Sequence, residues 1–430
     1  MVEHVQPFAG YRRRVVDGVL DELIAELPAV SLEGAKAVGK TSTARRRGGT
    51  VVSLDDPGVL EVVLAQPSLL TVGTPPIVID EWQRYPAAWD VIRRAVDEDP
   101  AGGRFILTGS ATPASRPTPS GAGRIVTVRT RPLTLSERGV GTPTVSLAAI
   151  LAGNRPRLGG VTDVTLTDYT REIVAGGFPG IRHRSGRAQR AALDGYLGRI
   201  VEADLPEVGR DVRRPQTLRR WLQAYAAATA TTASYEKIRN AATAGESAKP
   251  AKTTTGPYRE ALERLWILDP LPAWMPTANP LARLTYAPKH HLVDPALAAR
   301  LTGVDASALL RGEGPRAIPR DGTYLGSLFE SLATLCVRVF AEAAEARASH
   351  FRTKGGEREV DLIVERGDRT VVALEVKLSE TVSDHDVRNL RWLADRIGGG
   401  LADSVIITTG RHAYRRPDGV AVVPLALLGP

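Results

Sequence analysis

Short apolar runs alternate with helical periodicity in the N-terminal part of the chain. The segment YRRRVVDGVLDELIAEL places apolar side chains at helical spacing behind a basic start. The strand-like runs AVSLEG, GTVVSLDD, PPIVIDE and GRFILTGSA follow, and helical segments separate them. Runs that are apolar almost throughout are typical of strands buried on both faces. This alternation predicts βαβ units that build a parallel sheet.

The pattern changes twice further along the chain. A mostly helical section begins near residue 168, and residues 301–322 are rich in Gly, Pro and Arg, as linkers are. Beyond them a helical segment precedes the strand-like runs EVDLIVE, TVVALEVKL and DSVIITTG, which predicts a second α/β unit. We therefore divide the chain into an α/β domain over 1–165, a helical region over 166–300, a linker over 301–322 and an α/β domain over 323–430.

Composition restricts the class of protein without naming a function. Hydrophobic residues make up 43% and charged residues 24% of the 430 residues, as in soluble globular proteins. The single cysteine, Cys336, excludes a disulfide framework and a zinc site built from thiolates. No run approaches the roughly 18 consecutive apolar residues of a membrane span, so we expect a cytoplasmic protein without membrane contact. The net charge of +8 permits contact with nucleic acid but does not require it.

The sequence GAKAVGKT, residues 34–41, has the spacing of a phosphate-binding loop. Gly34 and Gly39 stand where backbone N–H groups must close around an anion. Lys40 can reach the outer phosphates, and the Thr41 hydroxyl can bind Mg²⁺. A strand-like run precedes the loop and a helical segment follows it, so the helix N-terminus adds a field that favours phosphate. We therefore expect a bound nucleotide, ATP, together with Mg²⁺.

Two later strand-like runs end in polar residues that complete such a site. In PIVIDEWQ the apolar run ends in Asp80, which can bind Mg²⁺ through water, and Glu81, which can orient or deprotonate an attacking water. The run RFILTGSAT ends in residues that include Ser110, at the place of a γ-phosphate sensor. A chance match of one motif is easy, but three in this order and spacing predict a nucleotide site.

These motifs also resemble those of a known group of proteins. GAKAVGKT, IVIDEWQRYP and FILTGSATP, followed by SGAGRIVTVRTRPLTLSE, look like the AAA-type P-loop ATPases of bacteria and archaea that carry a C-terminal domain of uncharacterised function with nuclease-like features. The resemblance is closest to actinobacterial members and extends over nearly the whole chain. It implies an AAA-like ATPase core, a winged-helix middle and a restriction-endonuclease-like α/β end.

An arginine beyond the sensor strand is a candidate for the cation that stabilises the γ-phosphate during transfer. Arg124, in SGAGRIV, follows that strand and a loop, as the arginine finger does in similar ATPases. Arg129 and Arg131, which alternate on one strand face in TVRTR, are competing candidates. An arginine finger acts within its own subunit or on a neighbouring one, so a homo-oligomer is a candidate assembly.

The helical region contains the order of elements found in a winged helix. TLRRWLQAYAAATATTASYEKIRNAAT and TTTGPYREALERLWILDPLPAW indicate helix, turn, helix, loop, helix and a strand-like pair. The third helix of such a unit can lie in a DNA major groove, which makes DNA a candidate partner. Its surface here carries as many negative as positive charges, which favours packing against protein over binding of phosphates. These surface residues are Arg259, Glu260, Glu263 and Arg264.

Acidic residues and a lysine interrupt the last apolar strands. In GEREVDLIVERGDRTVVALEVKLSE, Asp361 lies on one strand, and Glu375 and Lys377 share a face of the next because residues two apart point the same way. Two carboxylates can hold Mg²⁺, and the lysine can help a water to attack a phosphodiester. The set resembles that of PD-(D/E)xK nucleases, in which Glu330 in LGSLFESL matches the helical acidic residue. We therefore predict that Glu330, Asp361 and Glu375 converge on one metal ion.

Together these features predict a Mg²⁺-dependent ATPase coupled to a nucleic-acid-directed, nuclease-like activity. The expected catalytic residues are Glu81, Arg124, Asp361, Glu375 and Lys377. The rival interpretation is a nucleotide-dependent switch that binds another protein and whose C-terminal pocket is catalytically silent. Nicking of DNA by the purified protein with Mg²⁺ or Mn²⁺ distinguishes the two.

Overall fold

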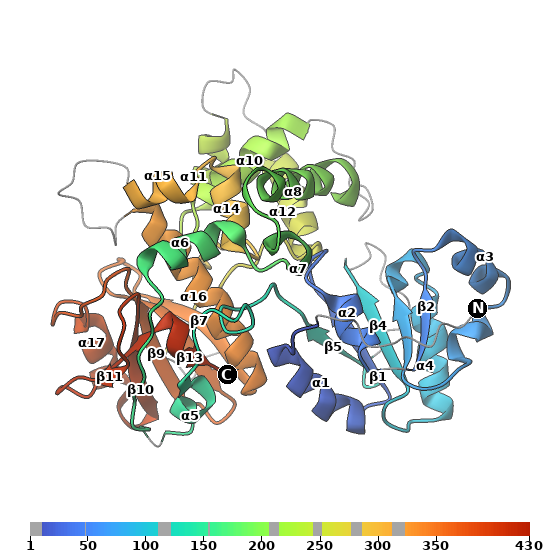
Figure 1. The fold of residues 1–430 in the computed structure, drawn as a ribbon, viewed down its shortest axis with the longest axis horizontal. Coiled ribbons are helices and arrows are strands. Elements are labelled where there is room, and N and C mark those ends of the chain that lie inside the picture. Colours follow the sequence, from blue (N-terminus) through green and yellow to red (C-terminus); the bar gives the residue numbers. More distant parts are fainter. Residues whose placement is uncertain are drawn as a thin grey trace.

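The structure is a computed structural model, and it contains two sheets and a mainly helical region. Figure 1 shows the N-terminal sheet in blue, the C-terminal sheet in red, and the helical region in green to yellow. The α/β class with a helical middle that the sequence predicts is confirmed. The structure describes residues 11–47, 49–110, 122–153, 155–205, 215–243, 252–276, 286–311 and 323–430.

The N-terminal sheet has five parallel strands in the order β2-β3-β4-β1-β5. Every residue of β1, β3 and β4 is buried, which explains why their sequences are apolar almost throughout. Because the strands are parallel, their carboxyl ends all lie at one edge of the sheet. The strands are β1 (Ala29–Glu33), β2 (Thr50–Ser53), β3 (Ile77–Asp80), β4 (Phe105–Gly109) and β5 (Ile125–Arg129).

Helices cover both faces of this sheet. Val78 of β3 belongs to a core shared with α1 and α2, whereas Ile79 belongs to a core shared with α3 and α4. Side chains alternate along a strand, so one buried strand serves both cores. The elements are α1 (Val15–Glu26), α2 (Lys40–Arg45), α3 (Pro57–Ala65), η1 (Pro67–Thr71), η2 (Trp82–Arg84) and α4 (Ala88–Glu98).

The middle of the chain is built from short helices and one extended pair. Isolated bridges join Leu268 to Leu292 and Leu271 to Lys289, and a third joins Ala273 to His350 of the C-terminal sheet. We call residues 268–274 and 287–292 the bridged pair; its first segment belongs to the strand-like run expected after the third helix. The helices are α6 (Leu166–Ala175), α7 (Pro179–Arg182), α8 (Gly186–Arg199), η3 (Ile200–Asp204), α10 (Pro215–Ala227), α11 (Tyr235–Ala242), α12 (Lys252–Arg264), α14 (Pro295–Leu301) and α15 (Ala306–Arg311).

The C-terminal sheet has six strands in the order β11-β12-β10-β9-β8-β7. Neighbours β7–β8, β8–β9 and β11–β12 are antiparallel, and β9–β10 and β10–β12 are parallel. Helix α16 packs against one face and α17 against the other. The elements are α16 (Tyr324–Ala343), β7 (Ala346–Arg352), β8 (Glu359–Arg366), β9 (Val371–Val376), α17 (Arg388–Ile397), η5 (Gly398–Gly400), β10 (Leu401–Thr408), β11 (Tyr414–Arg415), β12 (Ala421–Pro424), η6 (Leu425–Leu427) and β13 (Leu428–Gly429).

The packing of two segments differs from the division into domains that the sequence predicts. The stretch expected as a linker, 301–322, contains helix α15. Leu309 of this helix is buried where α15 packs on α6. Residues 312–322 lie outside the described part. Strand β6 (Val145–Ser146) pairs with β13, and α5 (Leu147–Leu151) packs on β9 and β10. The end of the segment 1–165 therefore packs with the C-terminal sheet.

Within the part of the chain that the structure describes, helix α16 alone is long and apolar enough to cross a membrane, by length and composition. Its most apolar 18-residue window has a mean hydropathy of 1.3, and 67% of that window is buried inside the protein. Glu330 and Arg338 interrupt its apolar sequence, which is why a search for uninterrupted apolar runs does not find it. Leu328, Leu332 and Cys336 of α16 belong to the largest core cluster.

Candidate functional site

The loop between β1 and α2 needs glycine at the two positions that the motif predicts. A Cβ on Gly34 would lie 2.1 Å from the carbonyl oxygen of Thr130, so any other residue would push the loop away from the chain after β5. Gly39 has a φ of 101°, a left-handed conformation that glycine adopts without strain. Helix α2 then begins at Lys40. The loop therefore has the backbone path that a phosphate-binding loop requires.

Lys40 is buried beneath this loop. Its Nζ donates hydrogen bonds to the carbonyl oxygens of Gly34 and Ala35, at 2.9 and 2.8 Å. Burial lowers the pKa of Lys40 to about 8, although the nearby Glu81 and Asp80 carboxylates act in the opposite direction. The ammonium is thus held at the loop that the motif predicts to carry phosphates.

Asp80 at the end of β3 joins two hydroxyl groups from neighbouring elements. Thr41 donates a hydrogen bond of 2.8 Å from its Oγ1 to Asp80 Oδ1, and Thr108 of β4 donates to the same oxygen. The second carboxylate oxygen, Oδ2, lies 3.7 Å from the Arg45 guanidinium. A hydroxyl and a carboxylate in contact are oxygen ligands of the kind that Mg²⁺ prefers, so the predicted pair Thr41 and Asp80 fits this ion.

Glu81 follows directly and has a strained backbone. Its φ of 56° and ψ of 46° lie in the left-handed region, which is uncommon for a residue with a side chain and is found at functional sites. Ser110 donates a hydrogen bond of 2.9 Å to Glu81 Oε2, and Gln83 donates to the same oxygen. The structure therefore brings the predicted residues Glu81 and Ser110 together, with Gln83 as an additional donor.

Arg124 lies far from these residues within one subunit. Parallel pairing aligns Ile125 with Ala29, at the amino end of β1, whereas the phosphate loop follows the carboxyl end of β1. The five residues of β1 rise about 3.3 Å each, so Arg124 lies at the opposite edge of the sheet. Its guanidinium pairs with Asp97 of α4 at 2.6 Å. The structure does not bring this predicted arginine finger to the nucleotide site of its own subunit.

The competing arginines, Arg129 and Arg131, form a buried ion cluster instead. Both pair with Asp269, at 3.0 and 2.9 Å, and Arg338 of α16 pairs with Asp269 at 2.9 Å. Burial alone would raise the pKa of Asp269, but the three guanidinium groups outweigh it and hold the pKa far below its usual range. The cluster ties the end of β5 to the middle of the chain and to α16. Both arginines are therefore structural within this subunit.

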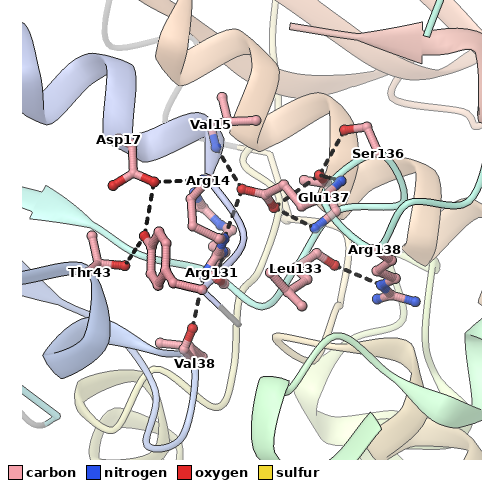
Figure 2. A network of polar contacts seen from close by, with 12 residues as sticks. Arg14, Val15, Asp17, Val38, Thr43, Arg131, Leu133, Ser136, Glu137 and Arg138 are labelled. Atoms are coloured by element: carbon pink, nitrogen blue, oxygen red, sulfur yellow. Dashed lines mark hydrogen bonds and ion pairs between the residues drawn. The ribbon is translucent and has the colours of Figure 1, made fainter. Parts of the chain in front are cut away.

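A second network of buried polar contacts ties the phosphate loop to the segment that follows β5 (Figure 2). Arg14 donates a hydrogen bond of 3.0 Å to the carbonyl oxygen of Val38 in the loop and one of 2.8 Å to the carbonyl oxygen of Arg131. Its Nε pairs with Glu137 at 2.8 Å, and Glu137 also accepts hydrogen bonds from the backbone and hydroxyl of Thr134. The loop is thereby tied to the segment that follows β5.

The C-terminal residues that the sequence predicts as a site lie at one end of the β8–β9 hairpin and on α16. The antiparallel register places Leu362 opposite Leu374, so residues just before 362 and just after 374 lie together. Asp361 Oδ2 accepts a hydrogen bond of 3.0 Å from the backbone N–H of Val376. Lys377 pairs with Glu375 at 3.2 Å.

A lysine outside the predicted set changes the character of this cluster. The Nζ of Lys289 lies 2.7 Å from Glu330, 2.9 Å from Glu359 and 2.8 Å from Asp361, and its side chain is 1% exposed. Within the described residues, no group of three or more His, Cys, Asp or Glu side chains is arranged to hold a metal ion. The convergence of Glu330, Asp361 and Glu375 on a metal ion stays a prediction; in the structure an ammonium group lies between Glu330 and Asp361.

Burial and neighbouring charges shift the pKa values of the acidic cluster in different directions. Burial raises the pKa of Glu330 to about 8, and the charge of Asp361 adds to the shift. Burial, together with Asp361, also raises the pKa of Glu375 well above its usual value. Burial would raise the pKa of Asp361 too, but Lys289 and Lys377 outweigh it and lower that pKa. Burial and mutual repulsion thus disfavour the charged forms of Glu330 and Glu375, and the two lysines offset this only in part.

Sequence reasoning missed several of these residues for identifiable reasons. Gln83 stands two positions after Glu81 in the motif and could have been noted as a hydrogen-bond donor. Arg14 and Lys289 lie in segments without any chemical motif; the acidic partner of Arg14 is 123 residues away, and the acidic partners of Lys289 are 41 or more residues away. Periodicity gives no signal for contacts of this kind.

Three parts of the chain match known family models. Residues 26–138 match an AAA domain. Residues 166–308 match a domain of unknown function, DUF8612, and residues 325–428 match another, DUF4143. The chain therefore carries an AAA-type, P-loop ATPase-like domain, as its motifs predict. The other two models name no activity.

Similar proteins extend over most of the chain. Uncharacterized proteins of Mycobacterium bovis and Mycobacterium tuberculosis are each 28% identical over 420 residues, which is 96% of this chain and 83% of each relative. A Walker-type ATPase of Pyrococcus abyssi has a TM-score of 0.39 and 17% identity, covering 66% of this chain and 94% of its own. The ORC2 protein of Aeropyrum pernix, in ADPNP and ADP complexes, has a TM-score of 0.30 and 15% identity, covering 69% and 94%.

Proposed function

We propose that this chain binds Mg-ATP in its N-terminal domain and hydrolyses it. The observation that carries the proposal is the hydrogen-bonded chain of Thr41, Asp80 and Thr108, which come from α2, β3 and β4 and meet beside the phosphate loop. The hydroxyl and carboxylate are suited to Mg²⁺, and Lys40 is suited to the phosphates. The AAA domain match over residues 26–138 supports the same assignment.

Hydrolysis in this proposal requires a base for the attacking water and cations that would neutralise the charge of the phosphates. Mg²⁺, when bound, neutralises charge on the phosphate oxygens. Glu81 takes a proton from water while the water oxygen bonds to the γ-phosphorus and the bond to the β–γ bridging oxygen breaks. Ser110 and Gln83 orient the Glu81 carboxylate through their hydrogen bonds, and Lys40 stabilises the charge of the outer phosphates.

Lys40→Ala should weaken ATP binding by about 100-fold or more, because it removes the buried ammonium from the phosphates. Titration calorimetry with ATP and Mg²⁺ measures the change. Lys36→Ala is a matched control: Lys36 lies in the same loop, but its ammonium pairs with Asp204 at 2.7 Å, so this variant should keep its affinity. Equal affinity in the wild type and in Lys40→Ala would reject the site.

An arginine finger, if Arg124 acts as one, has to serve a neighbouring subunit. The sheet register keeps Arg124 at the edge opposite the phosphate loop of its own chain, and its side chain is 43% exposed. We therefore propose Arg124 as a residue that completes the site of a second copy in a homo-oligomer. This assignment keeps the role that the motif order suggests.

We also propose that ATP turnover is coupled to a nucleic-acid-directed activity of the C-terminal domain. The observation in its favour is that Asp361, Glu375 and Lys377 gather at one end of the β8–β9 hairpin, beside Glu330 of α16. These carboxylates do not fit a metal ion as the structure holds them, because Lys289 lies among three of them. That observation favours the alternative, an ATP-dependent switch with a catalytically silent pocket.

Nicking of supercoiled DNA by the full-length protein, with Mn²⁺ or Mg²⁺ and with or without ATP, tests the coupling. Coupling requires nicking that depends on ATP, because the pocket as the structure holds it has Lys289 in place of a metal ion; such nicking should be lost in Lys377→Ala, while the rate of ATP hydrolysis is unchanged. Lys377 pairs with Glu375, whereas Lys354 lies outside this cluster, so Lys354→Ala serves as the control that keeps nicking. Absence of nicking under all four conditions would leave the silent switch as the function.

A further inference from the structure

A lysine from the middle of the chain ends inside the acidic pocket of the C-terminal domain. Lys289 precedes the domain by more than thirty residues in sequence, and the carboxylates that it contacts lie on α16 and β8. An ammonium group has three N–H donors. Three carboxylates lie within 2.9 Å of its Nζ, and those of Glu330 and Asp361 accept hydrogen bonds from it.

Backbone contacts on both sides of Lys289 hold it in this position. The N–H of Lys289 donates to the carbonyl oxygen of Leu271, and the N–H of Leu271 donates back, both at 2.9 Å. The other strand of the bridged pair joins the edge of the C-terminal sheet, where His350 and Pro272 share a hydrogen bond of 2.9 Å. His291 lies 3.2 Å from Ser331, which follows Glu330 on α16. Lys289 therefore lies on a strand of the bridged pair, which packs against the C-terminal sheet.

The pocket keeps one acidic atom without a partner even with Lys289 present. Glu375 is 6% exposed, and its Oε2 is buried and accepts no hydrogen bond from the described residues. Four carboxylates, those of Glu330, Glu359, Asp361 and Glu375, face two ammonium groups, those of Lys289 and Lys377. Buried carboxylates that outnumber the nearby cations are destabilising, so an additional cation would stabilise the pocket.

A divalent cation and the Lys289 ammonium would compete for the same oxygen atoms. Mg²⁺ takes carboxylate oxygens at about 2.0–2.1 Å, so a divalent ion on those oxygens would lie next to the ammonium and be repelled by it. We infer that Lys289 is an internal counter-cation that closes the C-terminal pocket to divalent metal ions while no nucleotide is bound. The inference rests on the C-terminal pocket proposed above, but it does not depend on DNA cleavage.

Lys289→Met tests this inference because methionine keeps the length of the side chain and removes its charge. We expect Mn²⁺ in excess to raise the melting temperature of the full-length variant by about 5 °C, reversibly with EDTA, and to leave that of the wild type unchanged. Lys289→Arg keeps a cation in the pocket and should behave as the wild type does. Differential scanning fluorimetry without nucleotide measures the shift, so the result is independent of the ATPase.

Two further variants keep the test decisive. Arg415→Met leaves the buried Asp403 of the same sheet without its bidentate partner, at 2.9 and 2.8 Å, and should lose stability without gaining a response to Mn²⁺. The double variant, Lys289→Met with Glu359→Gln, has one carboxylate fewer in the pocket. It replaces the single variant in the test if Lys289→Met does not fold without metal. An equal Mn²⁺ shift in the wild type, or no shift in Lys289→Met or in its double variant with Glu359→Gln, overturns the inference.

Discussion

Glu81→Gln should slow ATP hydrolysis by about 100-fold or more while leaving the affinity for ATP nearly unchanged. The amide keeps the size of the side chain and one acceptor oxygen, but it cannot take a proton from water. Ser110 and Gln83 both donate to Glu81 Oε2, which orients the carboxylate that the substitution removes. Steady-state phosphate release measures turnover, and titration calorimetry measures affinity.

The matched control for this experiment is Gln83→Ala. It removes one of the two donors to Glu81 and keeps the carboxylate, so turnover should fall by only about tenfold. A wild-type rate in Glu81→Gln would assign the base to another residue. Loss of ATP binding in that variant would instead show that Glu81 supports the fold of the loop.

Asp269→Asn should destabilise the protein by about 3–5 kcal/mol, because it leaves three buried arginines without their shared anion. Arg129, Arg131 and Arg338 all lie within 3.0 Å of the Asp269 carboxylate. These residues come from β5, the segment after it and α16, so the loss should weaken the packing of the N-terminal sheet on the rest of the chain. Calorimetric unfolding of the full-length protein measures it.

Glu342→Gln is the control within the same cluster. Glu342 pairs with Arg131 at 2.5 Å, but its side chain is 45% exposed, and exposed ion pairs contribute at most about 1 kcal/mol. Its removal should therefore change stability much less than Asp269→Asn does. Equal effects of the two substitutions would mean that the buried position of Asp269 does not determine its contribution.

Much of the N-terminal domain could be predicted from local sequence patterns. The runs AVSLEG, PPIVIDE and GRFILTGSA became the central strands β1, β3 and β4, because strands covered on both faces need apolar residues throughout. Gly34 and Gly39 carry backbone requirements that no other residue meets easily. Thr41 and Asp80 meet because parallel strands bring their carboxyl ends to one edge.

The C-terminal domain shows where prediction from the sequence ends. The alternation in EVDLIVE and TVVALEVKL correctly indicated the hairpin of β8 and β9, and Asp361 and Glu375 do lie at one end of it. The charge that balances them was not predictable, because Lys289 belongs to a segment that has no motif and lies 72 residues from Asp361. A metal ion and a lysine satisfy the same carboxylates, and only the fold decides which one is present.

The sequence by itself determined the elements, the glycine positions of the phosphate loop and the order of the acidic residues, because each of these depends on neighbours within a few residues. Only the tertiary structure decided the partners of the charged side chains. Arg124 points to Asp97 and not to the phosphate loop, since the parallel register places it at the other edge of the sheet. Lys289 enters the acidic pocket since the bridged pair docks on β7. Long-range ion pairs depend on how the domains pack, and the periodicity of the sequence carries no information about that packing.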